Sequence, residues 1–299
     1  MTYTATIIPQ AEVDLVTNNK PLLLATNLLD ETYSSAWVDG ASLVGTDYTA
    51  TGYPTSRAFD RYSHLQTKPN VAKSTYYLGF YLGTFEGEFD SFYLGGHNLG
   101  TLGGLTLDVQ IGTDMNFSGL VTIYSDSSIT TDKRILALNL HDTSTHTVPY
   151  RYNAVRWMRL KISGASVVPK IGEVWFGRRR HLPRKFEREL DDLRTGAEVN
   201  QFISRSGMTT NYVLSRGRQK RMGTTVIDTA ADVGTVTDFW EETEQGSRPF
   251  IFCENPGTSP NDCQVMTTDP ELTFPLVGPT SRNLTLSMEE TAPYSARES

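Results

Sequence analysis

The stretch Leu105-Thr106-Leu107-Asp108-Val109-Gln110-Ile111 decides the fold of the first half of this chain. Its odd positions are apolar and its even positions polar, which predicts a β-strand with one face in a core and the other in solvent. The stretch from Arg156 to Ile162 alternates in the same way, with cationic residues on one face. Further β runs of this half are apolar on both faces, as in buried sandwich strands; they span 76–82, 89–94 and 171–177. Strands at this spacing predict a jelly-roll β-sandwich over residues 1–178.

The second half, residues 179–299, has a different pattern, so we place a domain boundary between residues 178 and 179. A helix is predicted over 229–245, because apolar residues recur on one face at helical spacing. Short β runs surround it, with a basic turn at 216–221; these runs span 209–215, 224–228, 248–252, 265–266, 272–274 and 284–288. The expected fold class is mainly β: an N-terminal jelly-roll β-sandwich followed by a β-rich α+β domain with one amphipathic helix.

The charge distribution limits the classes of partner. A formal net charge of -7 gives no general attraction for nucleic acid or an anionic membrane. No apolar run approaches the roughly 20 residues that span a bilayer, so membrane insertion is not expected. The run at 178–185 is basic but lacks interleaved aromatics, which favours an electrostatic assembly surface over sequence-specific nucleic-acid binding. The residues assigned to this surface are Arg178, Arg179, Arg180, Arg184 and Lys185.

No motif for catalysis or for a cofactor stands in the sequence. A Gly-x-Ser-x-Gly elbow, a Walker loop and a His-Glu-x-x-His helix are all missing, so we expect a protein that is not an enzyme and has no cofactor. The five histidines are expected in structural or surface positions, and Glu86, Glu88 and Asp90 in a solvated turn. Cys253 and Cys263 flank a turn-rich stretch, and their redox state, reduced thiols or a disulfide, stays open.

Two sets of residues are candidates for ligand binding in the first domain. Oxygen ligands from turns suit calcium, and the candidates for such an ion at the base of the jelly roll are Asp39, Asp47 and Asp60. Aromatic rings form platforms on which sugars stack, and the candidates for a glycan platform are Tyr33, Trp37, Tyr48 and Tyr53; a packed sandwich edge is the alternative for them.

The order of these segments resembles discoidin-like, galactose-binding-type jelly rolls over residues 25–177. The landmarks are the Ala58-Phe59-Asp60 turn, a Tyr-rich strand, the alternating strand at 105–111 and the pair at 156–162 and 171–174. In that family a glycine and a nearby tryptophan follow the turn. This chain has Arg61 and no tryptophan there, so the resemblance implies the fold and not the ligand.

Residues 180–299 resemble the β domains of tailed-phage tail-tip and baseplate proteins that form rings around the tail axis. This resemblance rests on a strand hairpin, a helix with Phe239-Trp240, the 248–252 strand and a final strand at 284–290. It implies a distal-tail-like structural protein of the virion, in a homo-oligomeric ring of six copies with tail tube, hub and fibre proteins as neighbours. The first nine residues lack the features of a secretory signal, so synthesis in the host cytoplasm is expected. The alternative is a glycan-binding adhesion module that contacts the host surface through the first domain.

Overall fold

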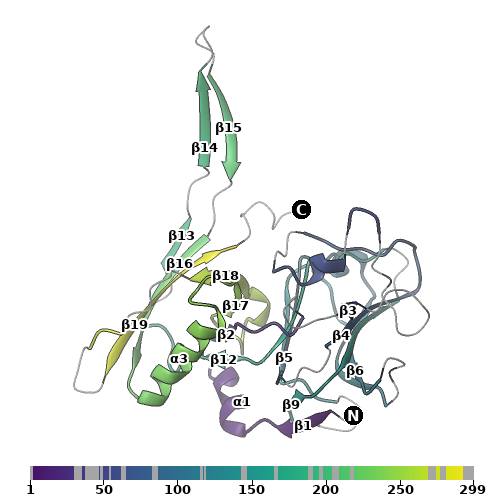
Figure 1. The fold of residues 1–299 in the computed structure, drawn as a ribbon, viewed down its shortest axis with the longest axis horizontal. Helices are drawn as coiled ribbons and strands as arrows, with labels where there is room; N and C mark the ends of the chain where they lie inside the picture. The colour runs from purple at the N-terminus through teal and green to yellow at the C-terminus, as the bar shows by residue number, and fades with distance from the viewer. Residues whose placement is uncertain are drawn as a thin grey trace. The chain divides into compact units, whose positions relative to one another are not determined.

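The computed structural model divides the chain into two compact units (Figure 1). The first comprises Met1–His181 together with Cys253–Cys263, and the second comprises Leu182–Phe252 and Gln264–Ser299. The predicted boundary, between 178 and 179, lies close to the first of these divisions, but the assignment of 253–263 to the first unit has no counterpart in the sequence analysis. The described residues are 3–29, 36–37, 47, 50–53, 55–61, 65–82, 87–114, 117, 119–142, 147–164, 168–187, 191–194, 198–203, 209–215, 219–268, 274–276 and 281–291, of which 36–37, 191–194, 198–203, 209–215 and 219 are described by their backbone.

A five-stranded antiparallel sheet forms one layer of the first unit. Its order is β3-β4-β10-β6-β7, and the strands are β3 (Ala36–Trp37), β4 (Thr75–Tyr81), β10 (Trp157–Ser163), β6 (Thr106–Gly112) and β7 (Val121–Asp126). The two stretches with the clearest alternation are therefore neighbours at the centre of the sheet, with Leu160 opposite Val109. Because both strands bury their aliphatic face, their register is set by the core.

A three-stranded antiparallel sheet forms the second layer and completes the sandwich. Its order is β11-β5-β8, with β11 (Glu173–Gly177), β5 (Ser91–Gly95) and β8 (Ile135–Leu138). Side chains of both sheets share one buried core, where Leu160 and Val109 of the larger sheet are joined by Phe92 and Phe176 of the smaller. The rings of Phe92 and Phe176 lie 5.0 Å apart, within the range of favourable aromatic pairs.

The outer face of the larger sheet differs from the prediction. Asp108 and Gln110, expected in solvent, are buried, and so is Arg159 on the neighbouring strand. Arg159 Nε donates to Gln110 Oε1 at 2.8 Å, and Lys161 pairs with Asp108 at 3.0 Å. The Arg159 guanidinium also lies 4.4 Å from the ring centre of Phe117. Cross-strand pairing satisfies these polar groups, so alternation located the strand correctly but not the exposure of its polar face.

Smaller elements complete the first unit. They are β1 (Thr4–Ile7), α1 (Gln10–Thr17), β2 (Leu22–Leu24), η1 (Thr55–Ala58), α2 (Leu99–Leu102), β9 (Tyr150–Asn153), β12 (Arg180–His181) and η2 (Pro260–Asp262). Strand β1 pairs with β9, and β2 pairs with β12. Helix α1 was not predicted: it buries only Val16, so its sequence lacks a wide apolar stripe. The 253–263 segment is held by Asn19, whose Oδ1 accepts the N–H groups of Gly257 and Thr258 at 2.9 and 3.0 Å.

In the described residues of the second unit, five antiparallel strands lie in one sheet and one helix packs on it. The strand order is β17-β18-β19-β16-β13, with β17 (Phe250–Cys253), β18 (Gln264–Thr268), β19 (Arg282–Glu290), β16 (Gln219–Ile227) and β13 (Asp191–Arg194). The helix α3 (Ala230–Glu242) matches the prediction, and the hydroxyl of Thr229 caps it by accepting the N–H of Asp232 at 3.1 Å. Phe239 packs edge-on against Phe250 at 4.9 Å, which fixes the helix on the sheet.

A two-stranded ribbon extends from this sheet. Strands β14 (Glu198–Ile203) and β15 (Thr209–Ser215) pair with each other, and Figure 1 shows the ribbon projecting beyond β13 and β16. The prediction of a basic turn over 216–221 is wrong in its second half, because β16 begins at Gln219. Lys220 stands opposite Glu289 of β19, and this pairing of unlike charges favours extension of the strand.

The predicted fold class is confirmed: the protein is mainly β, with a β-sandwich and a β-rich second part. The strand prediction at 272–274 lies largely outside the described residues. None of the helices in the described ranges combines the length and apolar character that a bilayer span requires.

Two glycines should respond to alanine with opposite signs. A Cβ on Gly177 would lie 2.0 Å from the carbonyl oxygen of Thr26, so Gly177→Ala should destabilise the first unit by about 2 kcal/mol or more. Gly234, inside α3, has nothing within 4 Å of such a Cβ, so Gly234→Ala should stabilise the second unit by about 1 kcal/mol. Urea unfolding followed by circular dichroism measures both, and a Gly177→Ala protein as stable as the wild type would contradict the packing described.

Candidate functional site

A pocket of about 450 Å³ lies among the loops of the first unit. Its volume is within the range of small-molecule sites. The lining combines amide, hydroxyl, ammonium and aliphatic groups: Ala50, Thr51, Lys68, Pro69, Asn70, Asn98, Val168 and Lys170. These residues come from four separate stretches of the chain, so the pocket exists only in the folded unit.

Hydrogen bonds between loops hold the walls of the pocket in place. The N–H of Ala50 donates to the carbonyl of Lys68 at 3.2 Å, and the side chain of Asn98 accepts the N–H of Lys170 at 2.7 Å. Thr67, next to Lys68, exchanges two backbone bonds with Ile171, at 2.7 and 3.0 Å. A site whose walls are tied in this way is largely formed before a ligand arrives, which reduces the entropy cost of binding.

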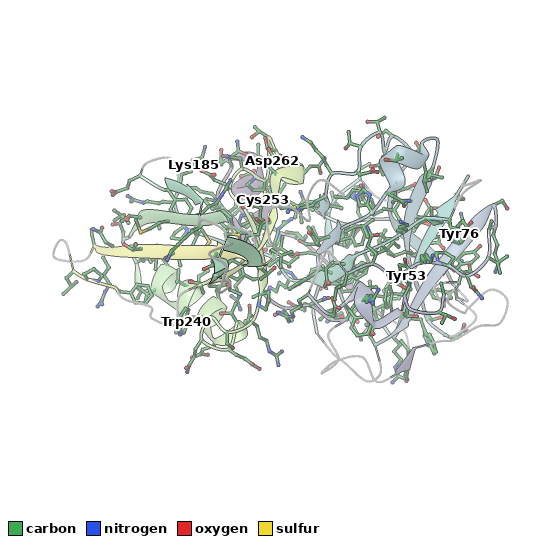
Figure 2. The ribbon with its side chains drawn as sticks, turned by 90° about the horizontal axis from the view of Figure 1, so that it is seen from above. Tyr53, Tyr76, Lys185, Trp240, Cys253 and Asp262 are labelled. Atoms are coloured by element: carbon green, nitrogen blue, oxygen red, sulfur yellow. The ribbon has the colours of Figure 1, made fainter. Side chains whose placement is uncertain are left out.

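The ring of Tyr53, which is labelled in Figure 2, contacts a lysine that lines the pocket. The ammonium of Lys68 is 4.1 Å from the centre of the Tyr53 ring, and the guanidinium of Arg57 is 5.7 Å from it. Both distances fall within the range of cation–π attraction. Tyr53, one of the four residues predicted to form a glycan platform, thus contacts cationic side chains with its ring. Tyr33, Tyr48 and the side chain of Trp37 lie outside the described residues.

The calcium candidates are placed only in part. Asp39 lies outside the described residues. Asp47 is engaged within the protein: it pairs with Lys73 and accepts the N–H of Tyr77 at 2.9 Å. Within the ranges that the structure describes, Asp47 and Asp60 belong to no group of three or more His, Cys, Asp or Glu side chains that could hold a metal ion.

Arg61 takes the position where the resembling family has glycine. Its φ is 65°, in the left-handed region that glycine favours, and its side chain is buried. The guanidinium lies 4.7 Å from the ring centre of Trp175, whose Nε1 donates to the carbonyl of Thr26 at 2.8 Å. Contact with a fully buried indole offsets the backbone strain at Arg61. Sequence alone could not pair residues 61 and 175.

The predicted assembly residues are divided between the two units. Arg178, Arg179 and Arg180 belong to the first unit, and Arg184 and Lys185 to the second. Arg179 is buried, with 4% of its surface exposed. Arg178 is exposed and pairs with Glu88 at 2.9 Å, while Arg184 pairs with Asp228. Part of the basic run therefore serves structure inside each unit.

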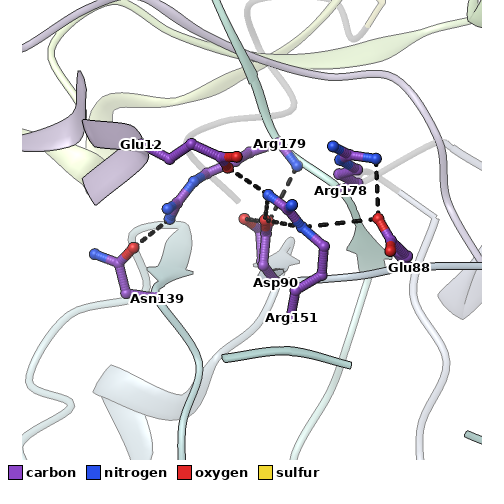
Figure 3. Close-up of polar contacts among 8 residues, drawn as sticks. Glu12, Glu88, Asp90, Asn139, Arg151, Arg178 and Arg179 are labelled. Atoms are coloured by element: carbon purple, nitrogen blue, oxygen red, sulfur yellow. Dashed lines mark hydrogen bonds and ion pairs between the residues drawn. The ribbon is translucent and has the colours of Figure 1, made fainter. Parts of the chain in front are cut away.

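Asp90 is the centre of a buried ionic network in the first unit (Figure 3). Its side chain is fully buried, which corrects the expectation of a solvated turn. Arg151 donates to it from Nε and Nη2 at 3.2 and 3.1 Å, and the N–H of Arg179 donates at 3.1 Å. Arg151 also pairs with Glu12 of α1. The network thereby connects the residue before β5 with β9, α1 and the segment after β11.

The network shifts the pKa values of its arginines in opposite directions. Burial lowers the pKa of Arg151, but Glu12 and Asp90 outweigh this effect and leave the pKa above its ordinary value. For Arg179, burial lowers the pKa, and Asp90 and Glu12 oppose this only in part. Arginine stays charged at neutral pH in either case. Arg151 is ion-paired with Asp90 and Glu12, whereas the Arg179 guanidinium donates to the side chain of Asn139.

Burial keeps two histidines neutral and both cysteines protonated at pH 7. Burial lowers the pKa of His97 and of His181 to about 4, so both rings are neutral at pH 7. Both cysteines are free and buried, and burial raises the pKa of Cys253 and raises that of Cys263 to about 12. Protonated, buried thiols are weak nucleophiles. His146 lies outside the described residues.

The fold and the site define a β-sandwich with a preformed pocket in its loops, and solved structures similar to the chain can be set beside it. Chitosan-binding module 1 from a chitosanase/glucanase of Paenibacillus sp. IK-5 is 13% identical, covering 50% of this chain and 97% of the module, with a TM-score of 0.34. The CBM32 of AlyQ in complex with 4,5-unsaturated mannuronic acid is 18% identical, covering 47% and 97%, with a TM-score of 0.31. A GH29 fucosidase of Ruminococcus gnavus in complex with fucose is 14% identical, covering 52% and 27%, with a TM-score of 0.35. No protein-family model and no curated protein matches the chain.

Loss of the charge on Asp90 should destabilise the first unit strongly. Asp90→Asn leaves Arg151 and the Arg179 N–H facing a neutral amide in a buried position, at a cost of about 3 kcal/mol. Glu88→Gln is the comparison at the exposed edge of the same network: Glu88 pairs with Arg178 at 2.9 Å and lies 3.9 Å from Arg151, and the loss of these exposed contacts should cost less than about 1 kcal/mol. Guanidinium unfolding of the two variants gives both values, and equal losses would rule out the central role of Asp90.

Proposed function

We propose that the first unit is a non-catalytic saccharide-binding sandwich that takes its ligand in the loop pocket. The observation that carries this proposal is the pocket itself: about 450 Å³, lined from four stretches of the chain that are held by hydrogen bonds of backbone and side-chain groups. A preformed concave site with a few polar groups among apolar ones is typical of ligand binding.

The chemistry of the lining supports a saccharide. Sugars present hydroxyl groups on their rim and C–H groups on their faces. The side-chain carbonyl of Asn98 accepts the N–H of Lys170. The NH₂ group of the same side chain therefore remains a donor for a ligand hydroxyl. Thr51 adds a hydroxyl that both donates and accepts, while Pro69 and Val168 supply aliphatic surface.

A bulky residue in the pocket should abolish this binding. Val168→Trp fills the pocket with an indole, whereas Val148→Trp places the same residue at an exposed position outside it, where 40% of the residue's surface is accessible. On a glycan array, the full-length wild type and Val148→Trp should give the same hits, and Val168→Trp should lose them. A blank array for the wild type, or hits that survive in Val168→Trp, would count against the pocket as the site.

A second candidate function is assembly as a structural protein of a tailed-phage tail tip or baseplate, located in the virion. The resemblance of residues 180–299 to ring-forming tail proteins motivates it, and the β14–β15 ribbon favours it. Among the described residues neither strand pairs with anything but the other, and an isolated two-stranded hairpin is at best marginally stable in water.

The register of the ribbon adds to this argument. Val199 lies opposite Val213 on one face, and Asn200 opposite Tyr212 on the other, so apolar residues occupy both faces. A ribbon with two open edges and apolar positions on each face is suited to contact other copies of the chain. Heterologous contacts of this kind close into a ring when the rotation between copies allows it.

Removal of the ribbon should therefore prevent assembly. Arg194 and Gln219 are directly paired, so residues 195–218 can be replaced by Asn-Gly, which closes two antiparallel strands in a tight turn. In native mass spectrometry the full-length protein should form one closed oligomer, a hexamer by resemblance, and the shortened protein a folded monomer. A full-length protein that stays monomeric at micromolar concentration, with no rings in negative-stain images, would overturn this candidate.

A further inference from the structure

We propose that the pocket of the first unit selects acidic saccharides, and that Lys68 and Lys170 contact the carboxylate or sulfate group of the ligand. The inference rests on the proposed saccharide-binding function and names the ligand class of the same site.

The charge of the pocket is opposite to that of the whole chain. Among the described residues, two lysines line the pocket and no carboxylate does. The whole chain carries 34 Asp and Glu against 27 Lys and Arg residues. A concave lining with two cations attracts anions.

Neither lysine has a carboxylate partner among the described residues, although both are half-buried. Other cations of the same unit are paired with carboxylates; these pairs are Lys73–Asp47, Lys161–Asp108, Arg151–Asp90 and Arg178–Glu88. A cation that loses part of its hydration without a partner is unfavourable, and an anionic ligand would supply the missing counter-charge.

Both lysines are positioned by neighbouring groups. The Tyr53 ring centre lies 4.1 Å from the Lys68 ammonium, which restricts where this flexible side chain points. The backbone of Lys170 is fixed by the Asn98 side chain at 2.7 Å. Tyr53 is therefore a positioning residue for Lys68, a role different from the sugar-stacking platform expected from the sequence.

The pocket is also larger than a bare inorganic anion needs, and part of its lining is apolar. About 450 Å³ of space with Ala50, Pro69 and Val168 in its lining leaves room for a sugar ring beside the charged group. The ligand class is accordingly a saccharide with an acidic substituent, a uronic acid or a sulfated sugar.

Isothermal titration of the full-length protein with matched ligand pairs tests this inference. One pair is trigalacturonate and its methyl ester; the other is a sulfated galactan oligosaccharide and its desulfated form. In at least one pair the acidic member should bind at least about tenfold more tightly than the neutral one, and added salt should weaken the acidic member alone. The two pairs separate carboxylate from sulfate recognition.

Lysine variants assign the effect to the pocket. Lys68→Gln and Lys170→Gln should each weaken binding of the acidic ligand about tenfold, because each removes a charge-assisted contact. Lys133→Gln, the same substitution at an exposed position of the first unit outside the pocket lining, should change nothing. Tyr53→Leu should weaken acidic binding, and Tyr53→Phe should restore it, since phenylalanine keeps the ring. Thermal melting shows whether each variant is folded.

Each result decides the matter. Equal affinity for acidic and neutral members, or acidic binding that survives both lysine variants, overturns the inference and leaves saccharide binding standing. If every glycan that binds on the array is uncharged, the inference is likewise overturned and saccharide binding still stands. No binding of any ligand, together with a blank array, overturns the inference and the proposed function together.

Discussion

The buried carboxylate of Asp90 is the interaction on which the first unit depends. It accepts two hydrogen bonds from Arg151 and one from the backbone of Arg179, in a position without solvent access. Because a buried charge must be paired, Asp90 holds the start of β5, the strand β9 that carries Arg151 and the segment after β11 close to one another. Arg151 extends this constraint to α1 through Glu12.

This constraint changes the meaning of the basic run at 178–185. In the sequence it reads as one continuous surface, but Arg179 is buried beside Asp90 and Arg178 is paired with Glu88. Arginine rather than lysine suits such positions, because the guanidinium stays charged when buried and donates along several directions. Lys68 and Lys170, which line the pocket from two separate loops, have no carboxylate partner among the described residues.

The two proposed functions involve different parts of the chain and are compatible. The pocket belongs to the sandwich and its tied loops, and the ribbon belongs to the second unit. A protein that assembles through one unit and binds a saccharide through the other would present several pockets at once, and such multivalency raises avidity without any new contact. Weak binding of the saccharide by each single copy would then be enough for tight attachment of the whole assembly.

The sequence by itself determined the elements whose signal is local. The alternation at 105–111 and 156–162 located the two central strands, and the spacing of apolar residues from Val233 to Trp240 located α3, because both patterns reflect the repeat of one segment against a core. Tyr53 and the basic run also stood out by residue type.

Only the tertiary structure decided which of these residues meet. Lys68 and Lys170 reach one pocket because Thr67 and Ile171 pair in the fold, and Arg61 meets Trp175 across more than a hundred residues of chain. The burial of Asp108, Gln110 and Asp90 likewise depends on partners that stand far away in the sequence. A pattern within one segment predicts which face is apolar. Whether a polar group is buried, and whether a charge is paired or can bind a ligand, depends on other segments that only folding brings close.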